Sequence, residues 1–384
     1  MRKPSSGMWC AAIVFSCTLT LCQSKPRARD LGVPFDGTPG PLNAITDVKG
    51  VEVGHTTLIS GDGPLKVGVG PVRTGVTAIL PRGKSSTDAV FAGYFSLNGN
   101  GEMTGTNWVE DSGFLDGPVM ITNTHSVGVV RDAVIRWKVK RGDPDMEGYW
   151  WSLPVVAETW DGYLNDINGF HVRTEDAIHA LDSATPGPVV EGNVGGGTGM
   201  ICNEFKGGIG TSSRVLSPKE GGYTIGVLVQ CNAGAREQLR IAGIPVGREI
   251  PGSKIWDDDT GSIIVVVATD APLIPTQLKR VARRVALGLG RTGSYSGDGS
   301  GDLFIAFSTA NPRAIEQKDL RQITMLPNGQ LDPVFLATVQ ATEEAVVNAM
   351  IAAEDMKGID NHFVPALPHD KLRQVLGKYN RMVK

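Results

Sequence analysis

Short apolar runs separated by glycine-rich turns dominate the pattern of hydrophobic and polar positions along the chain. Short apolar runs bounded by turn residues are typical of strands. Six runs predict strands, at residues 67–72, 76–80, 119–121, 223–229, 263–268 and 303–307. The run at 263–268 consists of Ile, Val and Ala alone, which predicts a central strand covered on both faces.

Helical spacing, in which apolar residues recur every three or four positions, occurs in four segments. The predicted helices are residues 126–137, 174–182, 275–289 and 333–354. In the third, Leu278, Val281 and Val285 form an apolar face, and basic residues fill the other face. The fourth is rich in Ala and Val, as expected of a helix packed on a sheet. Because no linker-like stretch divides the chain, this mixture predicts a single α/β domain.

The order of elements after residue 256 singles out one serine. Three acidic residues, 257–259, lead through Thr260 and Gly261 to Ser262, where the central strand begins. A helix, a glycine-rich loop at 293–302 and another strand follow. Ser262 is therefore predicted to lie at the mouth of a buried strand.

The first 24 residues have the features of a secretory signal peptide. Two basic residues precede an apolar run, 8–21, that is too short to span a membrane, and cleavage after Ser24 suits the small-residue preference. Lipidation at Cys22 is disfavoured because a bulky residue precedes it. We expect a mature chain of residues 25–384 in the periplasm or outside the cell.

Charge and cysteine content narrow the range of partners. Removing the leader deletes two basic and no acidic residues, so the formal charge of −3 becomes −5. That charge disfavours binding to nucleic acid. Cys202 and Cys231 are the two cysteines outside the leader. In an oxidising compartment a disulfide is open to them, but two separate core cysteines fit the sequence equally well.

Other motifs are excluded by their context. Residues 288–293 match the three-glycine dinucleotide fingerprint, but they end a predicted helix instead of joining a strand to one. Residues 297–302 resemble one turn of a calcium-binding β-helix, which requires tandem copies. The six histidines show no metal-ligand spacing, so no metal or organic cofactor is expected. His125 is interpreted as a hydrogen-bonded structural residue in preference to a catalytic one.

A Gly-Ser pair in a turn before a strand is common and does not by itself indicate a catalytic site. Gly261 and Ser262 indicate catalysis only if the peptide bond between them is cleaved. A serine nucleophile needs a base, and no histidine lies near Ser262 in the sequence. Cleavage before Ser262 would free an α-amine on the same residue. Such an amine titrates at about pH 8, so it would serve as the base at neutral pH.

Several strings around and before Ser262 carry a family resemblance. Three of them are Gly-Ser-Ile-Ile-Val-Val-Val-Ala-Thr-Asp-Ala-Pro-Leu at 261–273, Gln-Leu-Lys-Arg at 277–280 and Gly-Ser-Gly-Asp-Leu-Phe-Ile-Ala-Phe-Ser-Thr at 299–309. Matching strings upstream lie at 36–40, 45–51, 153–159, 195–200 and 233–234. Together, over nearly all of the mature chain, they resemble the family of L-aminopeptidase D-esterase/D-amidases and β-peptidyl aminopeptidases.

The resemblance implies a four-layer αββα sandwich, similar to the N-terminal-nucleophile (Ntn) hydrolases but with its own connectivity. It also implies self-cleavage into residues 25–261 and 262–384, which stay together, and assembly of several copies of this two-chain unit. The hydroxyl of Ser262 would attack the carbonyl of Gly261 and would afterwards attack the substrate.

Five further residues complete the expected site. Ser300 and Asp302 match the family's serine and carboxylate that contact the nucleophile and its amine, although relatives also carry Glu at the position of Asp302. Asn232 matches the asparagine that stabilises the oxyanion. Glu158 and Trp160 are candidates to bind the free ammonium of a substrate, since an anion or an aromatic face attracts a cation.

We therefore expect a serine aminopeptidase or amidase that releases N-terminal residues from peptides, amides or esters. Two alternatives stay open: a self-cleaving acyltransferase that passes the acyl group to an amine, and a periplasmic binding protein that kept the fold without the chemistry. The joint presence of Ser262, Ser300, Asp302 and Asn232 favours an enzyme.

Overall fold

Two main sheets and their covering helices form the structure, a computed structural model that describes residues 25–142, 151–252, 254–255, 261–316 and 319–383. The strands are β1 (Glu52–Ser60), β2 (Val72–Leu80), β3 (Val90–Gly99), β4 (Phe114–Leu115), β5 (Val119–Asn123), β6 (Val155–Thr159), β7 (Ile201–Cys202), β8 (Phe205–Lys206), β9 (Gly208–Val215), β10 (Thr224–Asn232), β11 (Gly261–Thr269), β12 (Ser300–Ser308), β13 (Met356–Lys357) and β14 (Phe363–Val364). The helices are α1 (Thr106–Ser112), α2 (Val127–Arg141), α3 (Thr174–Asp182), α4 (Val246–Glu249), α5 (Pro275–Thr292), α6 (Asp332–Ile351) and α7 (His369–Lys378).

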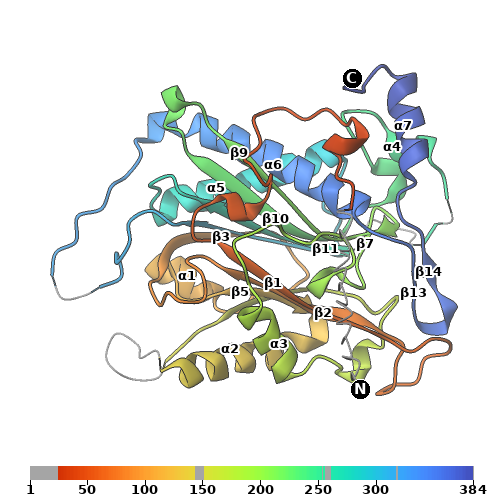
Figure 1. The fold of residues 1–384 in the computed structure, drawn as a ribbon, viewed down its shortest axis with the longest axis horizontal. Coiled ribbons are helices and arrows are strands. Elements are labelled where there is room, and N and C mark those ends of the chain that lie inside the picture. Colours follow the sequence, from red (N-terminus) through yellow and green to blue (C-terminus); the bar gives the residue numbers. More distant parts are fainter. Residues whose placement is uncertain (1–24, 143–150, 253, 256–260, 317–318, 384) are drawn as a thin grey trace, which may run out of the picture.

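The elements stack in four layers (Figure 1). A four-stranded sheet in the order β1-β2-β5-β6 faces a six-stranded sheet in the order β4-β3-β12-β11-β10-β9. Helices α2 and α3 cover the outer face of the first sheet, and α5 and α6 cover that of the second. Apolar cores fill the gaps between successive layers. The predicted αββα sandwich is confirmed.

The central strand β11 is buried on both faces, which explains its uninterrupted apolar sequence. Ile263 and Val265 belong to the core beneath α5 and α6, whereas Ile264 and Val266 belong to the core between the sheets. Side chains two apart on a strand share a face. The side chain of Ser262 therefore lies on the face of β11 that meets the four-stranded sheet.

Helix α6 is apolar on nearly all sides because other elements surround it. It packs on β9, β10 and α5. Its length and composition would suit a membrane span, but 83% of its most apolar window is buried inside the protein. Burial in the core accounts for its composition.

One predicted strand is wrong, whereas all four predicted helices form. The apolar run at 67–72 is a loop as far as residue 71, and β2 begins only at Val72. Gly68 and Gly70 adopt positive φ there, which interrupts extended backbone. Val67 and Val69 are 63% and 71% exposed, so this part of the run does not contribute to the core, whereas Val72, where β2 begins, is buried.

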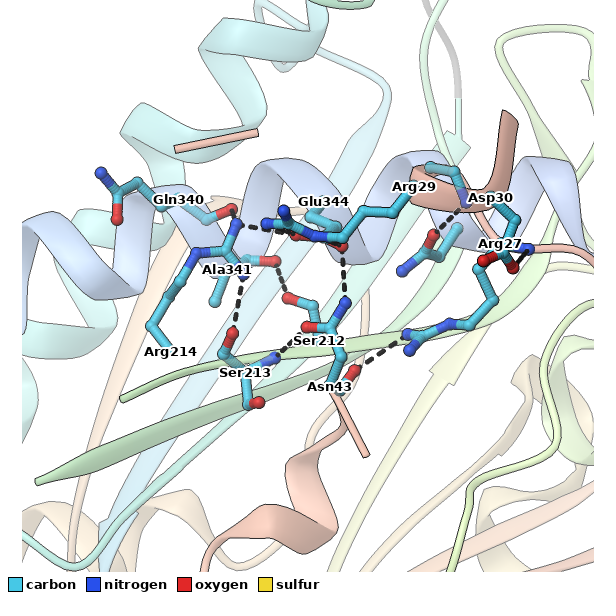
Figure 2. A network of polar contacts seen from close by, with 12 residues as sticks. Arg27, Arg29, Asp30, Asn43, Ser212, Ser213, Arg214, Gln340, Ala341 and Glu344 are labelled. Atoms are coloured by element: carbon cyan, nitrogen blue, oxygen red, sulfur yellow. Dashed lines mark hydrogen bonds and ion pairs between the residues drawn. The ribbon is translucent and has the colours of Figure 1, made fainter. Parts of the chain in front are cut away.

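A polar network joins the N-terminal segment to α6 (Figure 2). Arg29 donates two hydrogen bonds, of 2.8 and 2.9 Å, to the carboxylate of the fully buried Glu344. Arg214 on β9 lies 2.8 Å from the same carboxylate, and Asn43 donates to it at 2.6 Å. The segment before β1 is thereby fastened to a helix from the last fifth of the chain.

Candidate active site

The ends of three neighbouring strands bring most of the predicted site residues together. Strand β10 runs antiparallel to β11, and β12 runs parallel to it, so the last residue of β10 and the first residues of β11 and β12 share one end of the sheet. Asn232 pairs with Ser262 in the register, and Ser262 pairs with Gly301. Ser300 and Asp302 therefore flank the partner of Ser262.

Ser262 is the second residue of β11 and lies in a tightly enclosed position. Its side chain is 7% exposed, and its Oγ accepts a hydrogen bond from the backbone N–H of Gly301 at 3.2 Å. The preceding Gly261 has a φ of 130°, and a Cβ there would lie 2.1 Å from the carbonyl oxygen of Asn232. Only glycine fits this conformation and this close approach, which gives a physical reason for Gly261 before the serine.

Ser300 and Asp302 form a buried pair beside the nucleophile. The hydroxyl of Ser300 donates to Oδ1 of Asp302 at 2.7 Å, and both residues are at most 2% exposed. Within the described part of the chain, Oδ2 of Asp302 has no hydrogen-bond partner. Burial raises the pKa of Asp302, the hydrogen bond from Ser300 lowers it, and the net shift is upward. Direct contact of this pair with the Ser262 hydroxyl stays a prediction.

The side-chain amide of Asn232 is held at both ends. Its Oδ1 accepts from the backbone N–H of Ile201 at 2.7 Å, and its Nδ2 donates to the carbonyl of Trp160 at 2.9 Å. If the amide were reversed, its NH₂ group would face the N–H of Ile201 and its oxygen would face the carbonyl oxygen of Trp160. Neither pair can form a hydrogen bond, so the amide orientation is determined. An amide nitrogen carries two hydrogens, and among the described residues only one acceptor, the carbonyl of Trp160, binds this nitrogen, which lies on a residue that lines the cleft.

A disulfide links the residues next to Ile201 and Asn232, the two partners of the first of these contacts. Cys202 and Cys231 are bonded, which decides the alternative that the sequence left open. Cys202 follows Ile201 directly, and Cys231 precedes Asn232 directly.

Glu158 projects from the end of β6, on the opposite sheet. It is 4% exposed; its Oε1 accepts from the backbone of Glu102 at 2.9 Å and its Oε2 from the hydroxyl of Thr124 at 2.5 Å. Burial raises the pKa of Glu158, and these two hydrogen bonds only partly offset the shift. The indole of Trp160 is 44% exposed and lies over Gly162, where a Cβ would come within 2.5 Å of the ring.

An open cleft of about 660 Å³ joins these groups where the two sheets meet. Its lining residues are Asn100, Gly101, Glu102, Thr124, Glu158, Trp160, Ile201, Asn232, Gly261, Ser262 and Gly299. Ser300 and Asp302 are absent from this lining, since they lie behind the strand ends. Sequence reasoning missed Glu102 and Thr124, because no pattern in the chain indicates which loop reaches the end of β6.

His125 differs from its predicted role as a hydrogen-bonded structural residue. Its ring is exposed and stacks on Phe170 with centroids 5.9 Å apart, and among the described residues it makes no hydrogen bond. It is not among the residues that line the cleft. Within the described ranges, no three His, Cys, Asp or Glu side chains gather in a way that would hold a metal ion.

Comparison with known proteins finds relatives that match most of the chain. The model of peptidase family S58 matches residues 43–364. The chain is 54% identical over 373 residues, 93% of each protein, to the β-peptidyl aminopeptidase BapA of Sphingosinicella microcystinivorans. Its structure resembles that of the L-aminopeptidase D-Ala-esterase/amidase of Ochrobactrum anthropi, described as a variant of the Ntn hydrolase fold, with a TM-score of 0.87 and 52% identity over 94% of this chain and 100% of that one.

A β-aminopeptidase from a Burkholderia species is also similar, with a TM-score of 0.85 and 45% identity over 92% of this chain and 99% of that one. These likenesses extend over the strands that carry Asn232, Ser262 and Asp302. The family resemblance expected from the sequence is therefore confirmed. The chain belongs to peptidase family S58 and is a hydrolase of peptide and amide bonds.

Proposed function

We propose that the chain cleaves itself between Gly261 and Ser262, and that Ser262 then removes N-terminal residues from peptides, amides or esters. The observation that carries the proposal is the meeting of Ser262, the oriented amide of Asn232 and the Ser300–Asp302 pair at one end of the sheet. In this arrangement a nucleophile, an oxyanion donor and a carboxylate serve both reactions.

Self-cleavage proceeds as an acyl shift. The Ser262 hydroxyl attacks the carbonyl carbon of Gly261 and loses its proton, the C–N bond breaks, and the nitrogen takes up a proton to become the free α-amine. The resulting ester joins Gly261 to the Ser262 oxygen. Water hydrolyses that ester, which leaves a carboxylate on Gly261 and restores the hydroxyl. The second N–H of Asn232 donates to the oxygen that becomes negative in each step.

In turnover, the freed α-amine of Ser262 accepts the proton of the hydroxyl as it attacks the substrate carbonyl. The amine returns that proton to the leaving amine, and an ester between substrate and Ser262 forms. Hydrolysis of this ester releases the product acid. Glu158 binds the substrate's ammonium, because its carboxylate faces the same cleft with room for a further donor on each oxygen.

The substrates we propose carry a free N-terminal β-amino residue. Support comes from the two curated relatives at 54% and 49% identity, both named β-peptidyl aminopeptidases. The similar Ochrobactrum enzyme is named for L-residues and D-Ala esters or amides. A panel of p-nitroanilides of β-, L- and D-residues decides between these classes, and a preference for L-residues would contradict the β assignment.

We further propose that both chains stay associated after cleavage and that the protein is exported and oligomeric. The Glu344 network supports the first point, since it joins residues 25–261 to α6 across the proposed break. The strand pairing of β10 with β11 adds to it. The leader at 1–24, which lies outside the described residues, and the disulfide support export.

Denaturing electrophoresis tests self-cleavage. Purified protein should give two bands of about 26 and 13 kDa, at ~110 Da per residue, with an N-terminal sequence starting at Ser262. Both cysteines of the disulfide lie before the break, so reductant should not change the bands. One undivided band in protein that still hydrolyses substrate would contradict the mechanism.

Two substitutions separate the roles of nucleophile and oxyanion donor. Ser262→Ala should neither split nor turn over substrate. Asn232→Ala should lose about 10²–10³ in kcat, since removing one oxyanion donor typically costs that much.

Turnover of an aminoacyl amide should release free acid with no added acceptor. Turnover that starts only when an amine acceptor is supplied would indicate a transferase instead.

A further inference from the structure

The disulfide lies between two hydrogen bonds that hold one short segment along the end of β10. The backbone N–H of Ile201 donates to Oδ1 of Asn232 at 2.7 Å, and the backbone N–H of Asn203 donates to the carbonyl of Ala233 at 2.9 Å. The bond from Cys202 to Cys231 ties the same two stretches of chain covalently. Residues 201–203 therefore lie beside residues 231–233 in a fixed register.

The other side of this segment is held by a buried lysine. Nζ of Lys206 donates to the carbonyls of Met200 and Gly207, and the side chain is fully buried. The carbonyl of Met200 belongs to the same peptide unit as the N–H of Ile201. Lys206 thus holds the peptide between Met200 and Ile201 by its carbonyl, and the disulfide holds the residue that follows Ile201.

The peptide N–H of Ile201 is the group that selects the orientation of the Asn232 amide. If the segment shifted, Oδ1 of Asn232 would lose its donor, and the amide would be held only through Nδ2 by the carbonyl of Trp160, so that it could turn about its last torsion, which is a soft one. Rotation would turn Nδ2 away from the site of the developing negative charge. A displacement of about 1 Å at a catalytic group is enough to cost ~10²-fold in rate.

We propose that the Cys202–Cys231 disulfide is a positioning element for the oxyanion donor Asn232, so that the rate of the chemical step depends on the oxidation state of these cysteines. This rests on the proposed function, in which Asn232 stabilises the oxyanion. The cysteines touch no substrate; they act through the Ile201 peptide. Oxidation by a small disulfide such as glutathione disulfide joins the two thiols into the protein disulfide and reduces the small disulfide to two thiols, so that two electrons and two protons pass to it.

A double-mutant cycle tests the proposal. The full chain is prepared unaltered, with Cys202→Ala and Cys231→Ala together, with Asn232→Ala, and with all three changes. kcat and KM for an aminoacyl p-nitroanilide are measured per chain that has split at Ser262. Removing the disulfide should lower kcat at least about tenfold and change KM less than about twofold. In the Asn232→Ala background, the same removal should lower kcat by less than about twofold.

A merely structural role of the disulfide gives a different result. A loss of kcat of equal size in both backgrounds, or no loss in either, would overturn the proposal. A chain that neither splits nor turns over when unaltered would instead refute the proposed function itself. The two failures are therefore distinguishable.

A second measurement covers the case in which the cysteine variants do not fold. The unaltered chain is made in a reducing cytoplasm, purified under a phosphine reductant, and then oxidised with glutathione disulfide. kcat should rise at least about tenfold as the two thiols disappear, with KM nearly constant. Equal kcat in the dithiol and disulfide forms would overturn the proposal.

Discussion

Two buried carboxylates in this protein have pKa values shifted in opposite directions. Glu344, on α6, is surrounded by cations and amides: burial raises its pKa, but the hydrogen bond from Arg29 and the charge of Arg214 outweigh burial and leave the pKa lowered. Asp302, at the start of β12, has the hydroxyl of Ser300 on one oxygen and no hydrogen-bond partner for the other among the described residues. Burial raises its pKa.

The difference separates a structural acid from a reactive one. A buried carboxylate that is paired with buried cations is destabilising to remove, because the cations are then left in the interior without an opposite charge. A buried carboxyl without a cation costs stability and persists where chemistry needs its perturbed pKa. Glu344 fastens one half of the chain to the other, whereas Asp302 lies beside the proposed nucleophile.

Among the buried carboxylates, the largest effect on activity is expected at Asp302. Asp302→Asn removes the carboxylate that we expect to contact the nucleophile and its amine during proton transfer, and should lower kcat about 10²–10⁴-fold. Because the folded-state pKa of Asp302 is raised, its ionised form costs stability as the pH rises above the ordinary range for Asp. The variant should therefore melt no lower than the unaltered chain at neutral pH. A large fall in melting temperature would show that Asp302 is structural, like Glu344.

Glu344→Gln should have the opposite signature. The guanidinium of Arg214 is 1% exposed, and without its partner charge we expect a loss of about 3–5 kcal/mol in the free energy of unfolding. Turnover per folded chain should hold, because Glu344 is not among the residues that line the cleft. Thermal unfolding of the Ser262→Ala precursor measures this on one uncut chain.

The neighbouring residue supplies the control. Glu343 pairs with the partly exposed Arg291 at 2.9 Å, and an ion pair of that kind is worth less than about 1 kcal/mol. Glu343→Gln should leave the melting temperature almost unchanged. Equal destabilisation by the two substitutions would contradict the view that the buried ion pair of Glu344 stabilises the fold more than the partly exposed ion pair of Glu343.

The four-layer sandwich was implied only by the family resemblance, whereas the central strand and the four helices were predictable because burial, on both faces of a strand or on one face of a helix, leaves a plain pattern in the sequence. The run at 263–268 is apolar without interruption for that reason, and α5 alternates apolar and basic faces because only one face packs. The run at 67–72 was misread, since apolar residues also occur in exposed loops and two glycines with positive φ break the extended backbone. Local pattern alone does not distinguish these cases.

The site was predictable from residue resemblance, not from local physics. Asn232 and Ser262 lie 30 positions apart, and only the register of β10 on β11 brings them opposite each other. Lys206 shows the limit most clearly: a lysine is rarely fully buried, and nothing in its sequence neighbourhood indicates the backbone carbonyls that satisfy it. Long-range pairing supplies such partners, and sequence spacing does not reveal it.

Glu158 extends the comparison to a third buried acid, and its substitution is expected to lower activity less than that of Asp302. Its pKa is raised by burial, and it must be ionised to bind an ammonium, so kcat/KM should fall with acid at a pH above the ordinary range for Glu. Glu158→Gln should remove this acid limb and lower kcat/KM about tenfold at neutral pH, since a charged hydrogen bond is roughly twice as strong as a neutral one.

The substrate itself supplies the control for Glu158. An N-acetylated ester has no ammonium, so its slow hydrolysis should be the same in the Glu158→Gln variant and in the unaltered chain. If the variant lost activity equally on free and acetylated substrates, Glu158 would not bind the substrate's ammonium. It would instead maintain the shape of the cleft through Glu102 and Thr124, its two hydrogen-bond donors. Its raised pKa would then be a cost of that structural position, and the acid limb would persist in the Gln variant.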